Sequence, residues 1–332
     1  MDSGASSSRV AVSGTGGVIG ARVLQWLAQS FDVIDIDQMI DADQAAHVSE
    51  AVSGADALVH LRLTREITSD RLRWVLAAAD VPHLTLVSSA SVYGAWPNHP
   101  TPISEDMPVR PNLESSFAVH HADAERTVLE WRDAAGERSG QSGRQVAILR
   151  PAPVVSSGLG GPIGEAMLAA APIRTGSDDP PVQFLHLDDL ASAVVLAVRQ
   201  RLAGVFNVAP DGWLAPSELR ALLGARPKVR LPLPAPERLD RYVARRVGHA
   251  APDGLLPFTR FSWVVANDRL RAAGWEPRYS SAQAYVIADA GMPWDDLNAR
   301  QRQYAMLAGA GAALVVGGWA ATAWLRRSYA LR

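Results

Sequence analysis

The sequence predicts an α/β protein: a Rossmann-type, doubly wound parallel sheet with a smaller C-terminal substrate lobe and one C-terminal transmembrane helix. Short apolar runs alternate with helical segments over the first two thirds of the chain, a glycine-rich turn follows the first run, and 22 uncharged residues stand together near the C-terminus. Alternating strands and helices are typical of right-handed βαβ units, whose helices cover both faces of a parallel sheet.

The expected elements follow one another in regular order. We predict strands at 10–13, 33–36, 57–61, 84–88, 145–149 and 205–208, and helices at 21–29, 44–52, 70–79, 116–131 and 187–199. Ahead of them, residues 1–8 are expected to form a flexible tail, so that the main domain extends over 9–299. Glycine and proline are frequent after residue 151, which indicates a lobe built mainly from 152–182 and 205–290.

The composition excludes several classes of protein. The 332 residues include 34 acidic and 32 basic side chains, too even a balance for a protein that neutralises a phosphate backbone, so we expect no nucleic-acid partner. The chain has no cysteine, which excludes disulfides, thiolate metal sites and thiol nucleophiles. Its histidines are scattered, and we expect no metal site.

Three glycines at a spacing of three, Gly14, Gly17 and Gly20, lie between the first expected strand and the first expected helix. Glycines at these positions permit a tight turn and a close approach of a pyrophosphate to the backbone. The start of the helix adds unpaired N–H groups and a positive dipole, and we include Val18 and Ile19 in the site for this reason. The pattern predicts a dinucleotide site.

Asp37 closes the second expected strand, 17 residues after Gly20. A carboxylate there can accept hydrogen bonds from both hydroxyls of an adenosine ribose, and it would repel a 2′-phosphate. The predicted cofactor is therefore NAD(H) in preference to NADP(H). The alternative is that the glycine turn only packs a helix against the sheet.

Seven segments resemble the extended short-chain dehydrogenase/reductases, also called NAD-dependent epimerase/dehydratases. They are SGTGGVIG at 13–20, ADALVHL at 55–61, LVSSASVYG at 86–94, a run from ISED at 103–106 through RP at 110–111 to AER at 124–126, LRP at 149–151, HLDD at 186–189 and FNV at 206–208. The resemblance covers residues 9–290 and implies a Rossmann fold with a nicotinamide cofactor. We place Leu61, Ser88 and His121 at the cofactor site as well.

The catalytic residues of that family are only partly present. A serine four residues before the tyrosine of the VYG segment polarises the substrate in the family, which implies Ser89 here. A Tyr-x-x-x-Lys pair on the next helix supplies the acid/base and holds the nicotinamide ribose. Its positions fall on Phe117 and His121, and the single lysine, Lys228, belongs to no such pair. The phenol and the ammonium that support proton exchange during hydride transfer are therefore both missing.

Several roles remain open for the polar groups nearby. His121 replaces the acid/base, binds only the ribose, or packs as an ordinary histidine. Phe117 is expected to form a wall of the cofactor pocket. The resemblance makes Tyr93 a substrate-side or loop-packing residue, and Arg150 either meets an anionic substrate or caps the edge of the sheet.

Residues 304–325 carry no charge and would span about 33 Å as a helix, enough to cross a bilayer. The alternative is a buried core helix rich in alanine and glycine; we predict a membrane span, followed by a short basic tail at 326–332. Small residues recur at every fourth position and would let another membrane helix approach closely: Gly309, Ala313, Gly317 and Ala321.

The orientation of this segment follows from the cofactor. The flanking arginines, two before and three after, do not settle it. The N-terminus lacks the basic region and apolar stretch of a secretory signal, so a nucleotide-binding domain is expected to stay in the cytoplasm. We predict a single-pass C-terminal membrane anchor with the NAD-binding domain cytoplasmic.

Two functions follow from these patterns. The first is a membrane-anchored, NAD(H)-binding protein that is non-catalytic or degenerate and acts as a redox sensor or a scaffold. The second is a divergent NAD-dependent oxidoreductase or epimerase, which uses Ser89 and His121 on a membrane-associated or sugar-nucleotide-like substrate.

Overall fold

The computed structural model describes residues 8–37, 49–50, 52–61, 69–139, 143–157, 160–171, 179–224 and 252–288. All of them belong to one compact unit within Met1–Asp289. In this part of the chain no helix is both long enough and apolar enough to cross a membrane. The predicted membrane span at 304–325 lies outside the described residues.

Six parallel strands form the central sheet in the order β2-β1-β3-β4-β5-β8. Their bounds are β1 Arg9–Ser13, β2 Asp32–Asp35, β3 Ala57–Leu61, β4 His83–Val87, β5 Gln145–Pro151 and β8 Gly204–Val208. The chain leaves β1 toward β2 on one side and returns to β3 on the other, so the direction of winding reverses between β1 and β3. This doubly wound arrangement confirms the predicted Rossmann-type parallel sheet.

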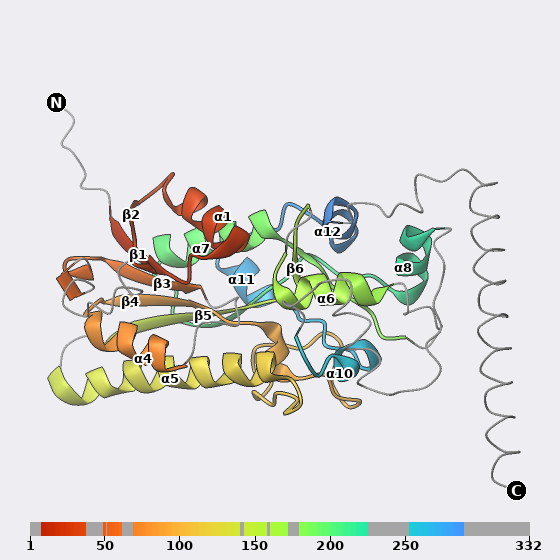
Figure 1. The fold of residues 1–332 in the computed structure, drawn as a ribbon, viewed down its shortest axis with the longest axis horizontal. Coiled ribbons are helices and arrows are strands. Elements are labelled where there is room, and N and C mark those ends of the chain that lie inside the picture. Colours follow the sequence, from red (N-terminus) through yellow and green to blue (C-terminus); the bar gives the residue numbers. More distant parts are fainter. Residues whose placement is uncertain are drawn as a thin grey trace, which may run out of the picture. The chain divides into compact units, whose positions relative to one another are not determined.

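Helices cover both faces of the sheet (Figure 1). Helices α1 (Gly17–Leu27) and α7 (Leu187–Arg199) pack together on one face, and α4 (Ser69–Ala78) and α5 (Ser116–Ser139) pack together on the other. Arg22 joins the first pair by a two-pronged ion pair with Asp188, at 2.6 and 3.0 Å.

The strands read as almost continuous apolar runs because both of their faces are buried. In β1, Val10 and Val12 join the apolar layer beneath α1 and α7, whereas Ala11 joins the layer beneath α4 and α5. The same alternation continues in β3, β4 and β5, so the sheet lies between two apolar layers.

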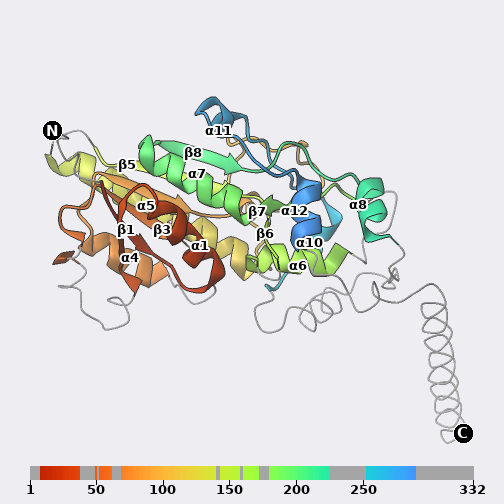
Figure 2. The same ribbon diagram turned by 90° about the horizontal axis from the view of Figure 1, so that it is seen from above.

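The C-terminal part adds short elements beyond the end of β5 (Figure 2). A second, two-stranded sheet pairs β6 (Val154–Val155) with β7 (Leu185–His186). The helices of this part are α6 (Pro162–Ala170), α8 (Pro216–Leu223), α10 (Leu256–Arg260), α11 (Asp268–Ala272) and α12 (Ser281–Ala288), and the 3₁₀ helix η1 (Ala90–Tyr93) follows β4.

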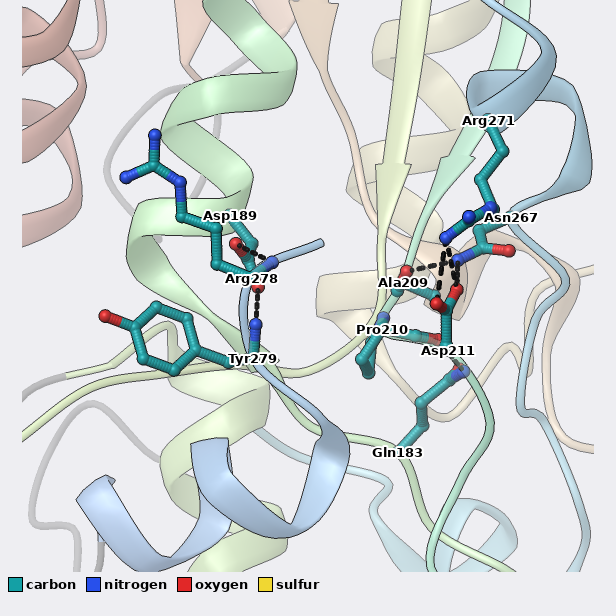
Figure 3. Close-up of polar contacts among 9 residues, drawn as sticks. All are labelled: Gln183, Asp189, Ala209, Pro210, Asp211, Asn267, Arg271, Arg278 and Tyr279. Atoms are coloured by element: carbon teal, nitrogen blue, oxygen red, sulfur yellow. Dashed lines mark hydrogen bonds and ion pairs between the residues drawn. The ribbon is translucent and has the colours of Figure 1, made fainter. Parts of the chain in front are cut away.

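Buried side chains fix the C-terminal segment to the core (Figure 3). Asp189, in the first turn of α7, accepts hydrogen bonds from the backbone N–H groups of Arg278 (2.9 Å) and Tyr279 (3.1 Å). Asn267 donates to the carbonyl oxygen of Ala209 at the end of β8 (2.9 Å). The carboxylate of Asp189 therefore ties a distant segment to α7, in addition to lying at a helix N-terminus.

Several expected element boundaries differ from the observed ones, and three of these differences are described here. Helix α1 begins at Gly17 rather than Ala21, because the last glycines of the turn already have helical hydrogen bonding. Strand β2 ends at Asp35, so Asp37 stands two residues beyond the strand instead of closing it. Helix α5 continues to Ser139, eight residues past the expected end. The helix expected at 44–52 lies mostly outside the described residues.

Candidate functional site

The glycine turn lies at the carboxyl end of β1, where the winding of the sheet reverses between β1 and β3. Gly14 (φ 77°) and Gly17 (φ 81°) adopt backbone conformations that side chains disfavour. Gly20 is required for a different reason: a Cβ there would stand 2.1 Å from the carbonyl oxygen of Thr15. The three predicted glycines therefore fold into a tight turn that enters α1 directly.

The first turn of α1 is open to solvent and presents backbone N–H groups. Gly16 occupies the N-cap position and has no side chain with which to cap the helix, and no acidic residue stands in the first turn. Gly16, Gly17 and Val18 are exposed, whereas Ile19 is buried. A helix start of this kind is suited to an anion, because its N–H groups and its dipole remain uncompensated.

Asp37 holds the glycine turn in place. Its carboxylate accepts hydrogen bonds from the N–H groups of Gly14 (2.8 Å) and Thr15 (2.6 Å). Asp37 therefore bonds to the N–H groups of the turn itself and not to those of the first turn of α1, which could bind a phosphate. Asp35 contributes a second carboxylate, which accepts a hydrogen bond from the N–H of Asp37 (3.0 Å).

A second helix begins beside this turn. A Cβ on Gly161, the N-cap of α6, would stand 3.4 Å from Cδ1 of Ile19, and one on Gly164 would stand 2.0 Å from the carbonyl oxygen of Val154. The start of α6 is thus packed closely against β6 and next to the first turn of α1. Leu61 is buried at the end of β3, in the same apolar layer as Ile19.

A buried polar network extends from the carboxyl end of β4 to β8. The hydroxyl of Ser88 donates to Glu125 on α5 (2.6 Å), and the guanidinium of Arg150 on β5 donates to both oxygens of that carboxylate (3.0 and 2.6 Å). Arg150 also donates to the phenolic oxygen of Tyr93 (2.8 Å), which donates to Asn207 on β8 (2.8 Å). One chain of bonds therefore joins the residue after β4, the 3₁₀ helix η1, helix α5 and strands β5 and β8.

The charges in this network are held fixed by their partners. Burial opposes the charge on Arg150, but the hydrogen bonds and the negative charge of Glu125 outweigh it and raise the pKa of Arg150. Burial raises the pKa of Tyr93, and the nearby cation of Arg150 opposes the rise. Arg150 takes neither of its two predicted roles. It is an internal ion-pair partner of Glu125 and is only 5% exposed.

The predicted catalytic residues lie close to this network. Ser89 is buried directly after β4, and its oxygen accepts a hydrogen bond from the N–H of Ser91 (3.2 Å) as the N-cap of η1. Phe117 and His121 lie one turn apart on α5, 6% and 2% exposed, with their ring centroids 4.3 Å apart. Glu125 follows on the same face of the helix, one turn later.

The contact of His121 fixes its tautomer. Its Nδ1 lies 2.8 Å from the carbonyl oxygen of Phe117, and because a carbonyl oxygen only accepts, Nδ1 carries the hydrogen. In the neutral ring, Nε2 then carries the lone pair. His121, which stands at the position that the resemblance assigns to the family's lysine, is thus oriented by the backbone of its own helix.

Sequence reasoning proposed the glycine turn, Asp37, Ser88, Ser89, Phe117 and His121 as site residues, but it did not point to the residues that hydrogen-bond to them. Thr15, Asp35, Glu125 and Asn207 all make buried or half-buried hydrogen bonds to predicted site residues or to their partners. A signal was available for Glu125, because it continues the spacing of four from Phe117 through His121. The resemblance includes Asn207 through FNV at 206–208, but nothing in the sequence pairs it with Tyr93, which is 114 residues away.

Comparison with known sequences identifies a family and several relatives. A family model described as "NAD dependent epimerase/dehydratase family" matches residues 22–209, more than half of the chain, beginning just after the glycine turn. Uncharacterized proteins of Mycobacterium tuberculosis and Mycobacterium bovis are 26% identical over 215 residues, which cover 63% of this chain and 54% of theirs. The chain thus spans about half the length of the curated relatives it matches.

Solved structures share the fold at low sequence identity. A dTDP-glucose 4,6-dehydratase from Bacillus anthracis in complex with NAD is 15% identical, with a TM-score of 0.57 over 85% of this chain and 95% of that one. RMD from Pseudomonas aeruginosa, complexed with NADPH, is 19% identical, with a TM-score of 0.59 over 85% and 96%. A UDP-N-acetylglucosamine 4-epimerase from Bacillus cereus is 15% identical, with a TM-score of 0.54 over 84% and 97%.

Proposed function

Because the chain belongs to the NAD dependent epimerase/dehydratase family, we propose that it binds NAD(H) at the glycine turn and has no proton relay for hydride transfer. Its role is then that of an NAD-responsive sensor or scaffold. The observation that carries the proposal is the contrast at one end of the sheet: α1 begins uncapped and exposed, whereas Phe117 stands at the position that the resemblance assigns to the family's catalytic phenol.

The residues of the turn fit a dinucleotide. The pyrophosphate would accept hydrogen bonds from the N–H groups at the start of α1, near Val18 and Ile19, and Asp37 would accept from the hydroxyls of the adenosine ribose. A negative charge at that position disfavours a 2′-phosphate, which supports NAD(H) over NADP(H). Leu61 and Ile19 supply apolar surface beside the turn.

The other groups at this edge support a non-catalytic role. A phenol that donates and accepts protons must be able to reach a substrate, and Tyr93 is fully buried with its oxygen bonded to both Arg150 and Asn207. Ser88 gives its hydroxyl hydrogen to Glu125. Phe117 has no group that exchanges protons and instead contacts the ring of His121.

The binding proposal is tested by thermal unfolding of the full-length protein in mild detergent with NAD, NADH, NADP or NADPH. Ligand at a hundred times its Kd adds about 2.7 kcal/mol to the free energy of unfolding, a shift of several degrees. We expect the shift with NAD or NADH, a smaller one with the phosphorylated pair, and none in Gly17→Val, which is strained at φ 81°. Equal shifts in wild type and Gly17→Val would contradict the proposed site.

A second candidate function is a divergent NAD-dependent oxidoreductase or epimerase on a membrane-associated or sugar-nucleotide-like substrate. The fixed tautomer of His121 favours it, because Nε2 then carries the lone pair that a general base needs. The hydroxyl hydrogen of Ser89 would polarise the substrate. In this candidate His121 takes the roles of both missing residues.

Substrate turnover separates the two candidates. The full-length protein is incubated with NAD and with dTDP-glucose or UDP-N-acetylglucosamine, the sugar nucleotides of the structural relatives, and epimerised or dehydrated product is measured. The first candidate predicts no product. Product from wild type that disappears in His121→Phe, with NAD affinity kept within about tenfold, would establish the second.

The membrane anchor is a further part of the proposal, supported by the length and apolarity of residues 304–325. The NAD-binding domain would lie on the cytoplasmic side, where NAD(H) is found. Replacing Leu314 and Val316 by arginine costs about 2.5 to 3.5 kcal/mol each in the bilayer and should release the full-length protein from sedimenting membranes. Unchanged sedimentation of the variant with membranes would contradict the proposed membrane anchor.

Complex formation through the segment is tested separately. Gly317 belongs to the stripe of small residues, and its replacement by leucine would keep a partner helix at a distance. We expect Gly317→Leu to disrupt complexes extracted in mild detergent while the protein stays in the membrane. Complexes that survive this change would remove the stripe as a contact surface.

A further inference from the structure

Two carboxylates compete for one hydroxyl beside the glycine turn. Thr15 Oγ1 lies 2.9 and 3.0 Å from the two oxygens of Asp35 and 2.9 Å from Oδ2 of Asp37. The residue is buried, and both carboxylates are half-buried. A hydroxyl has a single hydrogen, so it donates to one of the two carboxylates at a time.

The choice decides how much of Asp37 is left for a ligand. Each carboxylate oxygen has two lone-pair sites. Oδ1 of Asp37 uses one on the N–H of Gly14, and Oδ2 uses one on the N–H of Thr15. If the hydroxyl of Thr15 also donates to Oδ2, that oxygen is full. If it donates to Asp35, each oxygen of Asp37 keeps one free site.

We propose that Asp35 is a positioning residue for the adenosine-ribose site: it takes the hydroxyl hydrogen of Thr15 and so leaves Asp37 able to accept from two ribose hydroxyls. The inference rests on the proposed NAD(H) site. Asp35 also accepts a hydrogen bond from the backbone N–H of Asp37 through its Oδ1, and this bond fixes the loop just beyond β2. One carboxylate thus prepares the other for its ligand.

The test is the Kd for NAD of the full-length protein in mild detergent, by titration calorimetry. In D35A the hydroxyl of Thr15 turns to Asp37 and blocks one acceptor site, so NAD should bind about tenfold more weakly. In D35N the amide oxygen still accepts from Thr15 and from the N–H of Asp37, so affinity should stay within about threefold. Rescue by the uncharged, isosteric variant separates positioning from charge.

A double-mutant cycle with Thr15→Val isolates the mechanism. Without the hydroxyl nothing competes for Asp37, so T15V alone should bind NAD within about threefold of wild type. D35A should then weaken binding no more than about twofold in the T15V background. A tenfold effect of D35A in both backgrounds, wild-type affinity in D35A, or a tenfold loss in T15V alone would each overturn the proposal.

Failure of the proposed function gives a different result. If wild type binds no NAD at all, the ribose site does not exist and both proposals fall together. If wild type binds NAD and the D35A variant binds it equally well, only the role of Asp35 falls. Should D35A not fold, as judged by its unfolding transition without nucleotide, a tenfold loss of NAD affinity in T15V or in D35N would still overturn the proposal.

Discussion

The two halves of the candidate site use their polar groups in opposite ways. In the glycine-turn half, formed by Gly14–Gly20 with Asp35 and Asp37, the internal hydrogen bonds leave the first turn of α1 exposed and without a side-chain cap. In the α5 half, formed by Phe117, His121 and Glu125 with the ends of β4 and β5, the polar side chains bond to one another in a buried network.

This difference separates binding from chemistry. Groups that must meet a ligand keep free donors or acceptors, whereas groups that hold strands and helices together use theirs inside the protein. In an enzyme of this family both halves would contact the cofactor or the substrate. Under the proposed function, the glycine-turn half would bind the nucleotide and the α5 half would hold strands and helix together.

The largest expected effect tests the structural role of the α5 half. Glu125→Ala leaves the guanidinium of Arg150 buried without its carboxylate partner, which should lower the free energy of unfolding by about 3 to 5 kcal/mol. Denaturant unfolding of the full-length protein measures the loss. Folded Glu125→Ala protein should still bind NAD with nearly unchanged Kd.

A matched variant shows whether the pair or its shape matters. Glu125→Leu combined with Arg150→Met removes both charges together and should recover much of the stability lost in Glu125→Ala. If Glu125→Ala is as stable as wild type but has lost NAD binding, the structural role given to the α5 half is wrong, because Glu125 would then belong to the ligand site.

The next effect concerns the glycine-turn half. A Cβ on Gly20 would stand 2.1 Å from the carbonyl oxygen of Thr15, so Gly20→Ala forces the turn apart. We expect a loss of about 1 to 3 kcal/mol in stability and at least about a tenfold rise in the Kd for NAD. Titration calorimetry and thermal unfolding measure the two effects.

Gly16 provides the control in the same turn. A Cβ there meets no atom within 4 Å, and the backbone already has φ −57°, which any residue adopts. Gly16→Ala should therefore cost less than about 1 kcal/mol and keep NAD binding near the wild-type value. Equal losses in both variants would show that the turn does not depend on the close approach at Gly20.

The strand, turn and helix of the glycine-turn half could be predicted because their signals are local, although the contacts of Thr15 and Asp35 could not. The spacing of Gly14, Gly17 and Gly20 and the position of Asp37 all lie within 24 residues, and the geometry of a strand, a turn and a helix follows from them. The error was in the end of β2, where apolar alternation continues through Ile36 although the ladder with β1 stops at Asp35.

The α5 half was harder to predict because its contacts connect distant segments. Arg150 and Glu125 are 25 residues apart, and Tyr93 and Asn207 are 114 apart. The internal ion pair of Arg150 was not among its predicted roles, which were a contact with an anionic substrate and a cap on the edge of the sheet, because it depends on which side chain of α5 faces β5. Periodicity alone does not give the register of a helix against a sheet, so the sequence did not indicate that Glu125 would be the partner of Arg150.

The smallest expected effect is a pH dependence of the free energy of unfolding, which arises at the start of α7 beside the glycine-turn half. His186 is the N-cap of α7, the helix that packs beside α1, and its Nδ1 accepts from the N–H of Asp188 (3.2 Å) while its ring lies 3.9 Å from that of Tyr279. Burial lowers the pKa of His186, since it disfavours the charged ring. Protonation at Nδ1 would also remove the cap.

The sign follows from proton counting. With its folded-state pKa below the usual 6.5, His186 binds fewer protons in the folded protein than in the unfolded chain, so stability falls as pH drops below about 6.5. The slope is at most about 1.4 kcal/mol per pH unit for this group.

Asparagine is a good N-cap that does not titrate, so His186→Asn should unfold with a shallower pH dependence between pH 7 and 5. Burial lowers the pKa of His83 on β4 as well, so part of the slope should remain. A slope unchanged by His186→Asn would place the titrating group elsewhere and remove this pH sensitivity from the glycine-turn half.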